Sequence, residues 1–186
     1  IYDFNPVRFG GNIAQYLDWI NAIDGVGGAR VKRRTAGQRK IIATIVNSEY
    51  SKATSALVTT VQNSLDPNQN GDGTGIAPIG HEVTVQAADN ATINIYFEIT
   101  FDTGKSYSNM MTAITEIVEA YLLELRTDWG NYSADTPTIV RISQLETRIL
   151  ALSGVLDINN TKLNGTAANY SCTDNTIPVL GVITHD

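Results

Sequence analysis

The sequence predicts an α+β fold: two small α/β lobes, each with a helix–Gly-Val–strand unit packed on a short mixed or antiparallel sheet. Segments with helical periodicity alternate with segments rich in β-branched residues. One helix–strand pattern occurs twice, and the most turn-rich segment lies between its two occurrences. We therefore expect an N-terminal lobe over residues 1–88, containing a Gly-rich linker loop at 66–80, and a C-terminal lobe over residues 89–186.

The first lobe is expected to begin with a helix followed by a hairpin. Apolar residues recur at i, i+3, i+4 and i+7 along residues 12–23, which is the spacing of one helix face. Residues 26–34 and 40–46 are predicted to form the two strands of the hairpin, and the second strand is rich in β-branched residues. Ser51 is expected to cap a second helix, over residues 51–65.

The second lobe opens after a strand predicted over residues 81–87. Apolar residues occupy every second position of residues 92–101, which is the period of a half-buried strand and the clearest strand signal in the chain. Ser106 is expected to cap the longest helix, which runs to about Arg126. Its expected apolar face comprises Met110, Ile114, Ile117, Tyr121 and Leu125.

The rest of the second lobe is expected to contain a loop, a helix and two strands. Residues 129–137 are predicted to form the loop and residues 141–152 the helix. The strands are predicted over residues 155–159 and 179–184.

A weak internal repeat relates the two lobes. A shift of 129 residues aligns the helix and strand after residue 12 with those after residue 141. Both helices end at a Gly-Val pair, Gly25-Val26 in one copy and Gly154-Val155 in the other. Glycine suits the position after a helix because positive φ costs it nothing, so we expect each glycine to turn the chain into the next strand.

Size and composition are those of a folded protein. The chain has 186 residues and a mass of 20.1 kDa, with 42% hydrophobic and 17% charged residues, which is near globular averages. No apolar run approaches the roughly 18 residues that span a bilayer, so no membrane segment is expected. The single cysteine, Cys172, cannot form an internal disulfide. The first methionine is Met110, so we expect a fragment of a longer protein.

The charge is unevenly distributed along the chain. The net charge is −6, which argues against nucleic acid as the main partner. Six of the thirteen Lys and Arg residues nevertheless fall within the predicted hairpin, and the remaining seven face nineteen acidic residues. The six are Arg30, Lys32, Arg33, Arg34, Arg39 and Lys40. They predict either an electrostatic contact with an acidic partner surface or a solubilising strand edge that discourages edge-to-edge pairing.

No catalytic, cofactor or metal site is predicted. The pattern D-x-N-x-N-G over residues 66–71 resembles the start of a calcium loop, but Ala77 stands where such a loop needs a bidentate glutamate, so a turn-rich loop is preferred. The two histidines, His81 and His185, lie far apart in sequence, without zinc-ligand spacing. Neither a nucleophile elbow nor a phosphate-binding loop occurs, so no enzyme activity, small-molecule substrate or cofactor is expected.

Several motifs together resemble the baseplate J-like protein family. The segment Gly73-Thr74-Gly75-Ile76-Ala77-Pro78-Ile79-Gly80, followed by the strand His81-Glu82-Val83-Thr84-Val85, looks like the signature of that family. The resemblance extends to Gly10-Gly11-Asn12, Asp24-Gly25-Val26-Gly27 and the turn Ser153-Gly154-Val155-Leu156-Asp157-Ile158. It also includes Asn175-Thr176-Ile177-Pro178-Val179-Leu180-Gly181 near the end.

The resemblance implies a structural rather than a catalytic role. It implies a wedge subunit of the baseplate of a contractile-tailed phage or prophage, made in the cytoplasm of the bacterial host and placed in the virion tail. Its partners would be other wedge and hub proteins and copies of itself in a ring, with no nucleic acid and no membrane. The alternative is a receptor- or glycan-binding tail module that uses the loops after Gly130 and Gly165.

Overall fold

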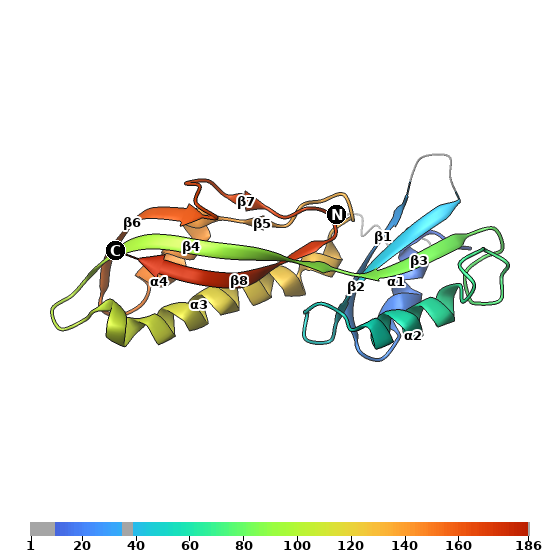
Figure 1. Ribbon diagram of the computed structural model, residues 1–186, viewed down its shortest axis with the longest axis horizontal. Coiled ribbons are helices and arrows are strands. Elements are labelled where there is room, and N and C mark those ends of the chain that lie inside the picture. The colour runs from blue at the N-terminus through green and yellow to red at the C-terminus, as the bar shows by residue number, and fades with distance from the viewer. Residues whose placement is uncertain (1–9, 35–38, 186) are drawn as a thin grey trace, which may run out of the picture. The chain divides into compact units, whose positions relative to one another are not determined.

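The computed structural model describes residues 10–34 and 39–185. The hairpin turn expected at residues 35–38 lies outside the described residues. Helices and short mixed and antiparallel sheets alternate along the chain (Figure 1), which confirms the predicted α+β class.

The chain divides into two compact units. Unit 1 consists of two segments, the chain up to Asp89 and Trp129–Thr136. Unit 2 consists of Asn90–Asp128 and the chain from Pro137 onward. Residues 129–136, expected as a loop of the C-terminal lobe, therefore lie in unit 1. The expected division into lobes at residues 88 and 89 stays a prediction.

Unit 1 is a three-stranded sheet covered by two helices. Its elements are α1 (Ile13–Asn21), β1 (Val26–Arg33), β2 (Lys40–Asn47), α2 (Ser55–Leu65), β3 (Glu82–Ala87) and the 3-10 helix η1 (Trp129–Asn131). The sheet order is β1-β2-β3; β1 and β2 pair antiparallel as the predicted hairpin, and β2 and β3 pair parallel. A parallel pair needs a crossover connection, and α2 supplies it. Helix α1 packs against β1 and α2 against β3 (Figure 1).

The second helix begins later than predicted. Its N-cap is Thr54, whose side chain accepts a hydrogen bond from the backbone N–H of Leu57 at 3.3 Å, and its first residue is Ser55. Ser51 belongs to the preceding turn, where its backbone N–H donates to the Asn47 side chain at 2.8 Å. Ser51 and Thr54 are both suitable capping residues and lie three positions apart in the sequence. Ser51 stabilises the turn after β2, and Thr54 caps the helix.

The loop over residues 66–80 lies between α2 and β3, two elements of unit 1. Its expected role as a linker between the lobes stays a prediction. Buried Asp66 holds the loop, because one carboxylate oxygen accepts from the backbone N–H of Gly71 at 3.2 Å and of Val83 at 3.0 Å. The loop also returns to the end of α2, where the backbone N–H groups of Ile76 and Ala77 donate to helix carbonyls at 3.0 Å each. These bonds satisfy carbonyls that a helix terminus leaves unpaired.

Side chains satisfy the outer edge of β3. The Gln62 amide nitrogen donates to the Val83 carbonyl at 2.9 Å, and its amide oxygen accepts from the Val85 backbone N–H at 2.8 Å. With Asp66 bound to the Val83 N–H, buried polar side chains thus occupy backbone groups that a further strand would otherwise pair with. The sheet of unit 1 is closed on this side to strand addition.

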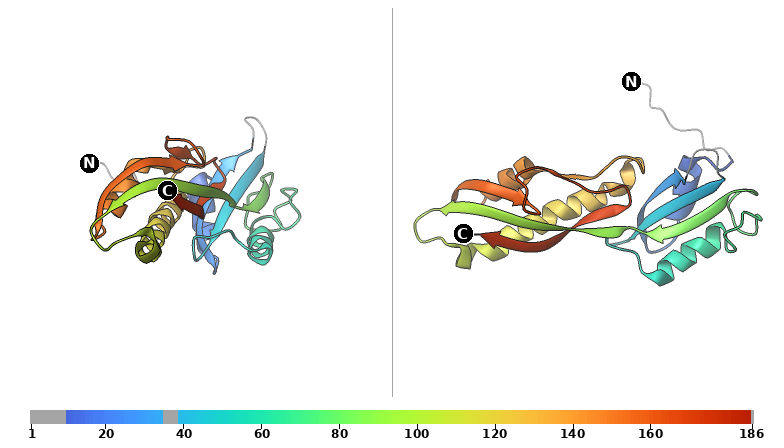
Figure 2. Two further views of the ribbon diagram at one scale, coloured as in Figure 1. Left: turned by 60° about the vertical axis from the view of Figure 1, so that its left-hand side comes forward. Right: turned by 45° about the horizontal axis from the view of Figure 1, so that its top comes forward.

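Unit 2 combines a long central strand with a long helix. Its elements are β4 (Asp89–Phe101), α3 (Tyr107–Thr127), β5 (Ile139–Val140), α4 (Ile142–Leu150), β6 (Val155–Leu163), β7 (Tyr170–Ser171) and β8 (Thr176–His185). Strand β4 lies between β6 and β8, and β5 and β7 form a separate two-stranded sheet (Figure 2). Helix α3 packs on β8 and α4 on β6.

The strongest sequence signals of unit 2 are confirmed. Ile93, Ile95 and Phe97 of β4 are buried, with polar residues between them. Ser106 is the N-cap of α3, and its backbone N–H donates to the Asn109 side chain at 2.9 Å. The buried face of α3 meets the sheet in one core, formed by residues of β4, α3, β5, α4 and β6.

Strand β6 continues four residues beyond the predicted end at Asn159. Asn160 has a φ of 56°, and the pairing of β4 with β6 shifts register between Tyr96 and Glu98. Such a shift marks a bulge, after which the ladder resumes with Lys162 opposite Tyr96. The polar run Asn159-Asn160-Thr161 resembled a loop because a bulge and a loop favour the same residue types.

The predicted repeat has the same backbone in both units. Gly25 has a φ of 90° and Gly154 a φ of 96°. In both, the N–H of the following valine donates at 3.1 Å to the carbonyl three residues before it. Helices α1 and α4 therefore end in the same left-handed turn, and β1 and β6 leave that turn in the same way.

Replacing either glycine by alanine should test this turn. An L-residue in the left-handed region costs about 1–2 kcal/mol, so Gly25→Ala and Gly154→Ala should each lower the free energy of unfolding by about that amount in urea titrations. Gly28→Ala is the control: its φ is not positive, and an added Cβ would meet the Val46 side chain at 3.5 Å and the Gly130 backbone at 3.6 Å, which are ordinary van der Waals distances. Equal effects at Gly25 and Gly28 would contradict the turn argument.

Candidate interaction surface

One of the six residues of the predicted basic cluster is buried, and the other five are exposed or half-exposed. Successive side chains of a strand point to opposite faces. Ala29 and Val31 of β1 join the core of unit 1, so Arg30 points the other way, toward Trp129–Thr136. That segment covers Arg30, which is only 2% exposed. Arg30 is therefore excluded from the predicted partner-binding residues.

Arg30 attaches residues 129–136 to β1. Its Nε donates to the Trp129 carbonyl at 2.8 Å, and an Nη donates to the Thr136 carbonyl at 2.9 Å. Its guanidinium carbon lies 4.4 Å from the centroid of the Trp129 ring, a cation–π contact. The segment approaches closely, since a Cβ on Gly130 would stand 3.2 Å from the Gly28 Cα. This arginine is a structural residue.

The remaining five residues form the exposed basic group: Lys32, Arg33, Arg34, Arg39 and Lys40. Lys32 is half-buried and the other four are exposed. Lys40 lies 3.3 Å from the Glu82 carboxylate on the neighbouring strand. Both partners are well exposed, so solvent screens this ion pair and it contributes little stability. Arg33, Arg34 and Arg39 place exposed positive charge on this side of the unit.

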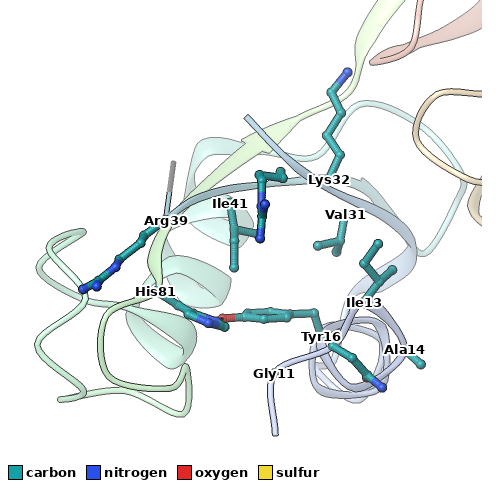
Figure 3. A pocket seen from close by; sticks show the side chains of 11 residues that line it. Gly11, Ile13, Ala14, Tyr16, Val31, Lys32, Arg39, Ile41 and His81 are labelled. Carbon is teal, nitrogen blue, oxygen red and sulfur yellow. The ribbon is translucent and has the colours of Figure 1, made fainter. Parts of the chain in front are cut away.

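A groove of about 710 Å³ adjoins the exposed basic group. Its lining comes from the start of α1, from β1 and β2, and from the segment before β3: Gly11, Asn12, Ile13, Ala14, Tyr16, Val31, Lys32, Arg33, Arg39, Ile41 and His81. Figure 3 shows Val31, Ile41 and Tyr16 near its centre, whereas Lys32 and Arg39 extend away from that centre. The groove thus has an apolar floor and a cationic rim.

Tyr16 and His81 form one wall of the groove (Figure 3). The Tyr16 hydroxyl oxygen lies 3.0 Å from the imidazole Nδ1 of His81, and the rings stack with centroids 6.1 Å apart. Burial, and secondarily the Asp66 carboxylate, raise the pKa of Tyr16 to about 12. The phenol therefore stays protonated at neutral pH and serves as a fixed hydrogen-bonding wall.

The N-terminus of α1 adds positive potential to the groove. Asn12 caps the helix, and its side chain accepts from the Gln15 backbone N–H at 2.9 Å. The partial positive charge of the helix dipole thus faces the same groove that Arg33 and Arg39 line. Ile13, at the first helical position, is 58% exposed and presents apolar surface at the same place. The groove is suited to an acidic partner that also carries an apolar side chain.

The other candidate features do not form a chemical site. Within the described part of the chain, no three His, Cys, Asp or Glu side chains come together in a way that could hold a metal ion. In the loop that resembled a calcium site, Asp66 is buried and binds backbone N–H groups, while Asp72 is exposed. Hydrogen bonds from Asn68 and Thr74 lower the pKa of Asp72 to about 2. Among residues 10–34 and 39–185, every helix is too short or too polar to pass through a lipid bilayer.

Sequence reasoning found the basic rim of the groove but missed its floor and walls. His81 lies 65 residues after Tyr16 in the sequence, and no motif joins it to Ile13 and Tyr16 at the start of α1. The one available signal was the capped helix start Gly11-Asn12-Ile13, which exposes an isoleucine where a polar residue is usual.

Two family models match the chain in tandem. The model described as "Baseplate J-like central domain" matches residues 8–87, and "Baseplate J-like protein C-terminal domain" matches residues 93–185. Two proteins of Bacillus subtilis (strain 168), "Phage-like element PBSX protein XkdT" and "Uncharacterized protein YqbT", are each 28% identical over 172 residues. Those residues cover 92% of this chain and 47% of each relative, so the chain spans about half of their length.

A solved structure has a similar fold. It is a chain in the "Cryo-EM structure of the anti-feeding prophage (AFP) baseplate, 6-fold symmetrised", which aligns with a TM-score of 0.63 at 10% identity. The alignment covers 91% of this chain and 37% of that chain. At this identity the likeness concerns the fold.

Removing Arg30 should destabilise unit 1. Arg30→Ala leaves the buried Trp129 carbonyl and the partly buried Thr136 carbonyl without their charged donor, so the free energy of unfolding should fall by about 2–4 kcal/mol in urea titrations. Hydrogen exchange should also accelerate in residues 129–136. Arg33→Ala is the matched control, because Arg33 is exposed and its removal should change stability by less than about 0.5 kcal/mol. A similar small effect at Arg30 would contradict its structural role.

Tyr16 should make stability depend on alkaline pH. A folded-state pKa near 12 lies above the ordinary value of 10.0, so its contribution is present below pH 10 and is lost as pH rises toward 12. Between these values the wild-type protein should lose more stability than Tyr16→Phe. Burial also raises the pKa of Tyr121, so ultraviolet titration of the phenolates should show one late-titrating tyrosine fewer in Tyr16→Phe than in the wild-type protein. If the tyrosine lost in the variant instead titrates near pH 10 in the wild-type protein, burial does not raise the pKa of Tyr16.

Proposed function

The chain belongs to the baseplate J-like family, and on that premise we propose that it is a structural subunit of a phage or prophage contractile-tail baseplate, forming the wedge ring around the hub. The tandem match of the central and C-terminal family models carries the proposal, because together they account for nearly all of the chain in the expected order. The prophage relative and the fold of the anti-feeding prophage baseplate chain support it.

The role is one of assembly rather than catalysis. The partners are other wedge and hub proteins and further copies of the chain, and the protein is made in the bacterial cytoplasm before it enters the tail. What the described residues offer for such contacts is surface: a groove with an apolar floor and exposed cations. The exposed basic group orients an acidic partner and speeds its approach more than it adds affinity. Stable attachment then comes from several weak contacts made together.

The alternative of a glycan- or receptor-binding module depended on loops after Gly130 and Gly165. The first of these lies in the segment held by Arg30, and Ala134 within it is buried. That loop is consequently part of the framework of unit 1 rather than a free binding loop. No observation on the described residues favours the module over the baseplate subunit.

Labelling of intact tails tests the proposed location. A small epitope tag fused to the intact protein should be detected by immunogold electron microscopy at the baseplate end of purified tails. The tag should be absent from the sheath and from the opposite end. Purified tails that contain the other tail proteins but lack the label altogether would refute the proposed function.

A further inference from the structure

The groove of unit 1 requires a partner surface with two properties. Its apolar lining includes Ile13, Val31 and Ile41, and Arg33 and Arg39 add positive charge to the same lining. Contacts of this kind are strongest where an apolar side chain enters a pocket and charges at the rim are matched. The partner surface should therefore carry an exposed large apolar residue beside carboxylates.

Helix α3 of unit 2 presents such a surface. Glu116, Glu119 and Leu123 are spaced i, i+3 and i+7, so they lie along one side of the helix. All three are exposed, and Leu123 is 41% exposed although it is a large apolar residue. The opposite side of α3, including Val118 and Leu122, is buried in the unit. We call Glu116, Glu119 and Leu123 the α3 acidic stripe.

We propose that the α3 acidic stripe of one copy docks in the groove of a second copy of this chain, with Leu123 on the apolar floor and Glu116 and Glu119 facing Arg33 and Arg39. The inference rests on the proposed function, since a baseplate ring brings copies together. Charge complementarity selects the occupant: the basic groove and the acidic stripe belong to the same chain, whose net charge is −6.

The contact joins two different surfaces and is therefore heterologous. Such contacts leave one groove and one stripe free at the ends of any open chain of copies, and they close into a ring when the rotation between copies permits. Each contact is small and partly polar, so it gives direction to the assembly without holding it alone.

A nucleic acid fits the groove less well. Single-stranded nucleic acids bind where exposed aromatic rings stack on bases. Tyr16, the aromatic residue in the groove lining, is 1% exposed and stacks on His81 instead. The apolar lining of Ile13, Val31 and Ile41 also offers no hydrogen-bond donor to a phosphate backbone.

A charge swap in the intact protein tests the pairing. Three variants replace the wild-type gene in the producing host: Arg33→Glu with Arg39→Glu, Glu116→Arg with Glu119→Arg, and all four changes together. Electron microscopy counts complete tails. Each double variant should reduce tail yield by about tenfold or more, because like charges then face each other across the contact. The fourfold variant should recover to within about twofold of wild type, because the pairs are restored in the opposite sense.

A matched control separates the pairing from general effects of charge. Glu49→Arg reverses an exposed charge in the turn after β2, outside both surfaces, and should leave tail yield unchanged. Circular dichroism should show that every variant is folded, as expected for changes at exposed positions.

Three results would overturn the pairing. In the first, the fourfold variant fails to recover; in the second, the acidic double variant assembles normally, which would assign the groove to another protein. In the third, the basic double variant loses measurable binding to nucleic acid while the acidic variant behaves as wild type. Immunogold labelling of wild-type tails distinguishes failure of the pairing from failure of the proposed function. If the label lies at the baseplate but the fourfold variant does not recover, only the pairing is wrong. If the label is absent from the tails, the proposed function is wrong.

Discussion

The buried guanidinium of Arg30 is the contact on which the organisation of unit 1 depends. It holds a segment that begins 99 residues later in the sequence, through a bond to the Trp129 carbonyl and the face of the Trp129 ring. A guanidinium suits this task because its donors are spread in a plane and its charge is delocalised over an aromatic face. An apolar residue in its place would leave the Trp129 and Thr136 carbonyls without this donor. One side chain thus makes residues 129–136 part of the unit.

A second set of polar contacts gives physical meaning to the glycine-rich family motif. Asp66 and Gln62 bind the backbone of β3 and so fix where that strand begins. Gly75 passes so close to α2 that a Cβ there would stand 2.2 Å from the Leu65 carbonyl oxygen. The segment after it delivers His81 to Tyr16 at the groove wall. The motif therefore describes a backbone path from the end of a helix to an interaction surface.

Local signals in the sequence predicted most elements, and long-range contacts account for what it did not predict. Alternation in β4, the cap at Ser106 and the turns at Gly25 and Gly154 each arise from neighbouring residues, so a single sequence reveals them. The basic group was recognised from composition, but the burial of Arg30 was not, because the segment that covers it is remote in sequence. The floor of the groove was missed for the same reason.

The path of the chain between the units has a mechanical consequence. The backbone leaves unit 1 after Asp89, returns for Trp129–Thr136 and leaves again before Pro137. The backbone therefore crosses between the units three times, after Asp89, after Asp128 and after Thr136. A force that pulls the units apart acts on all three connections together rather than on one hinge. Cleavage of the first connection alone would leave the pieces joined by the Arg30 contacts. Such redundancy lets the chain carry a pulling force between its units through the backbone instead of through surface adhesion.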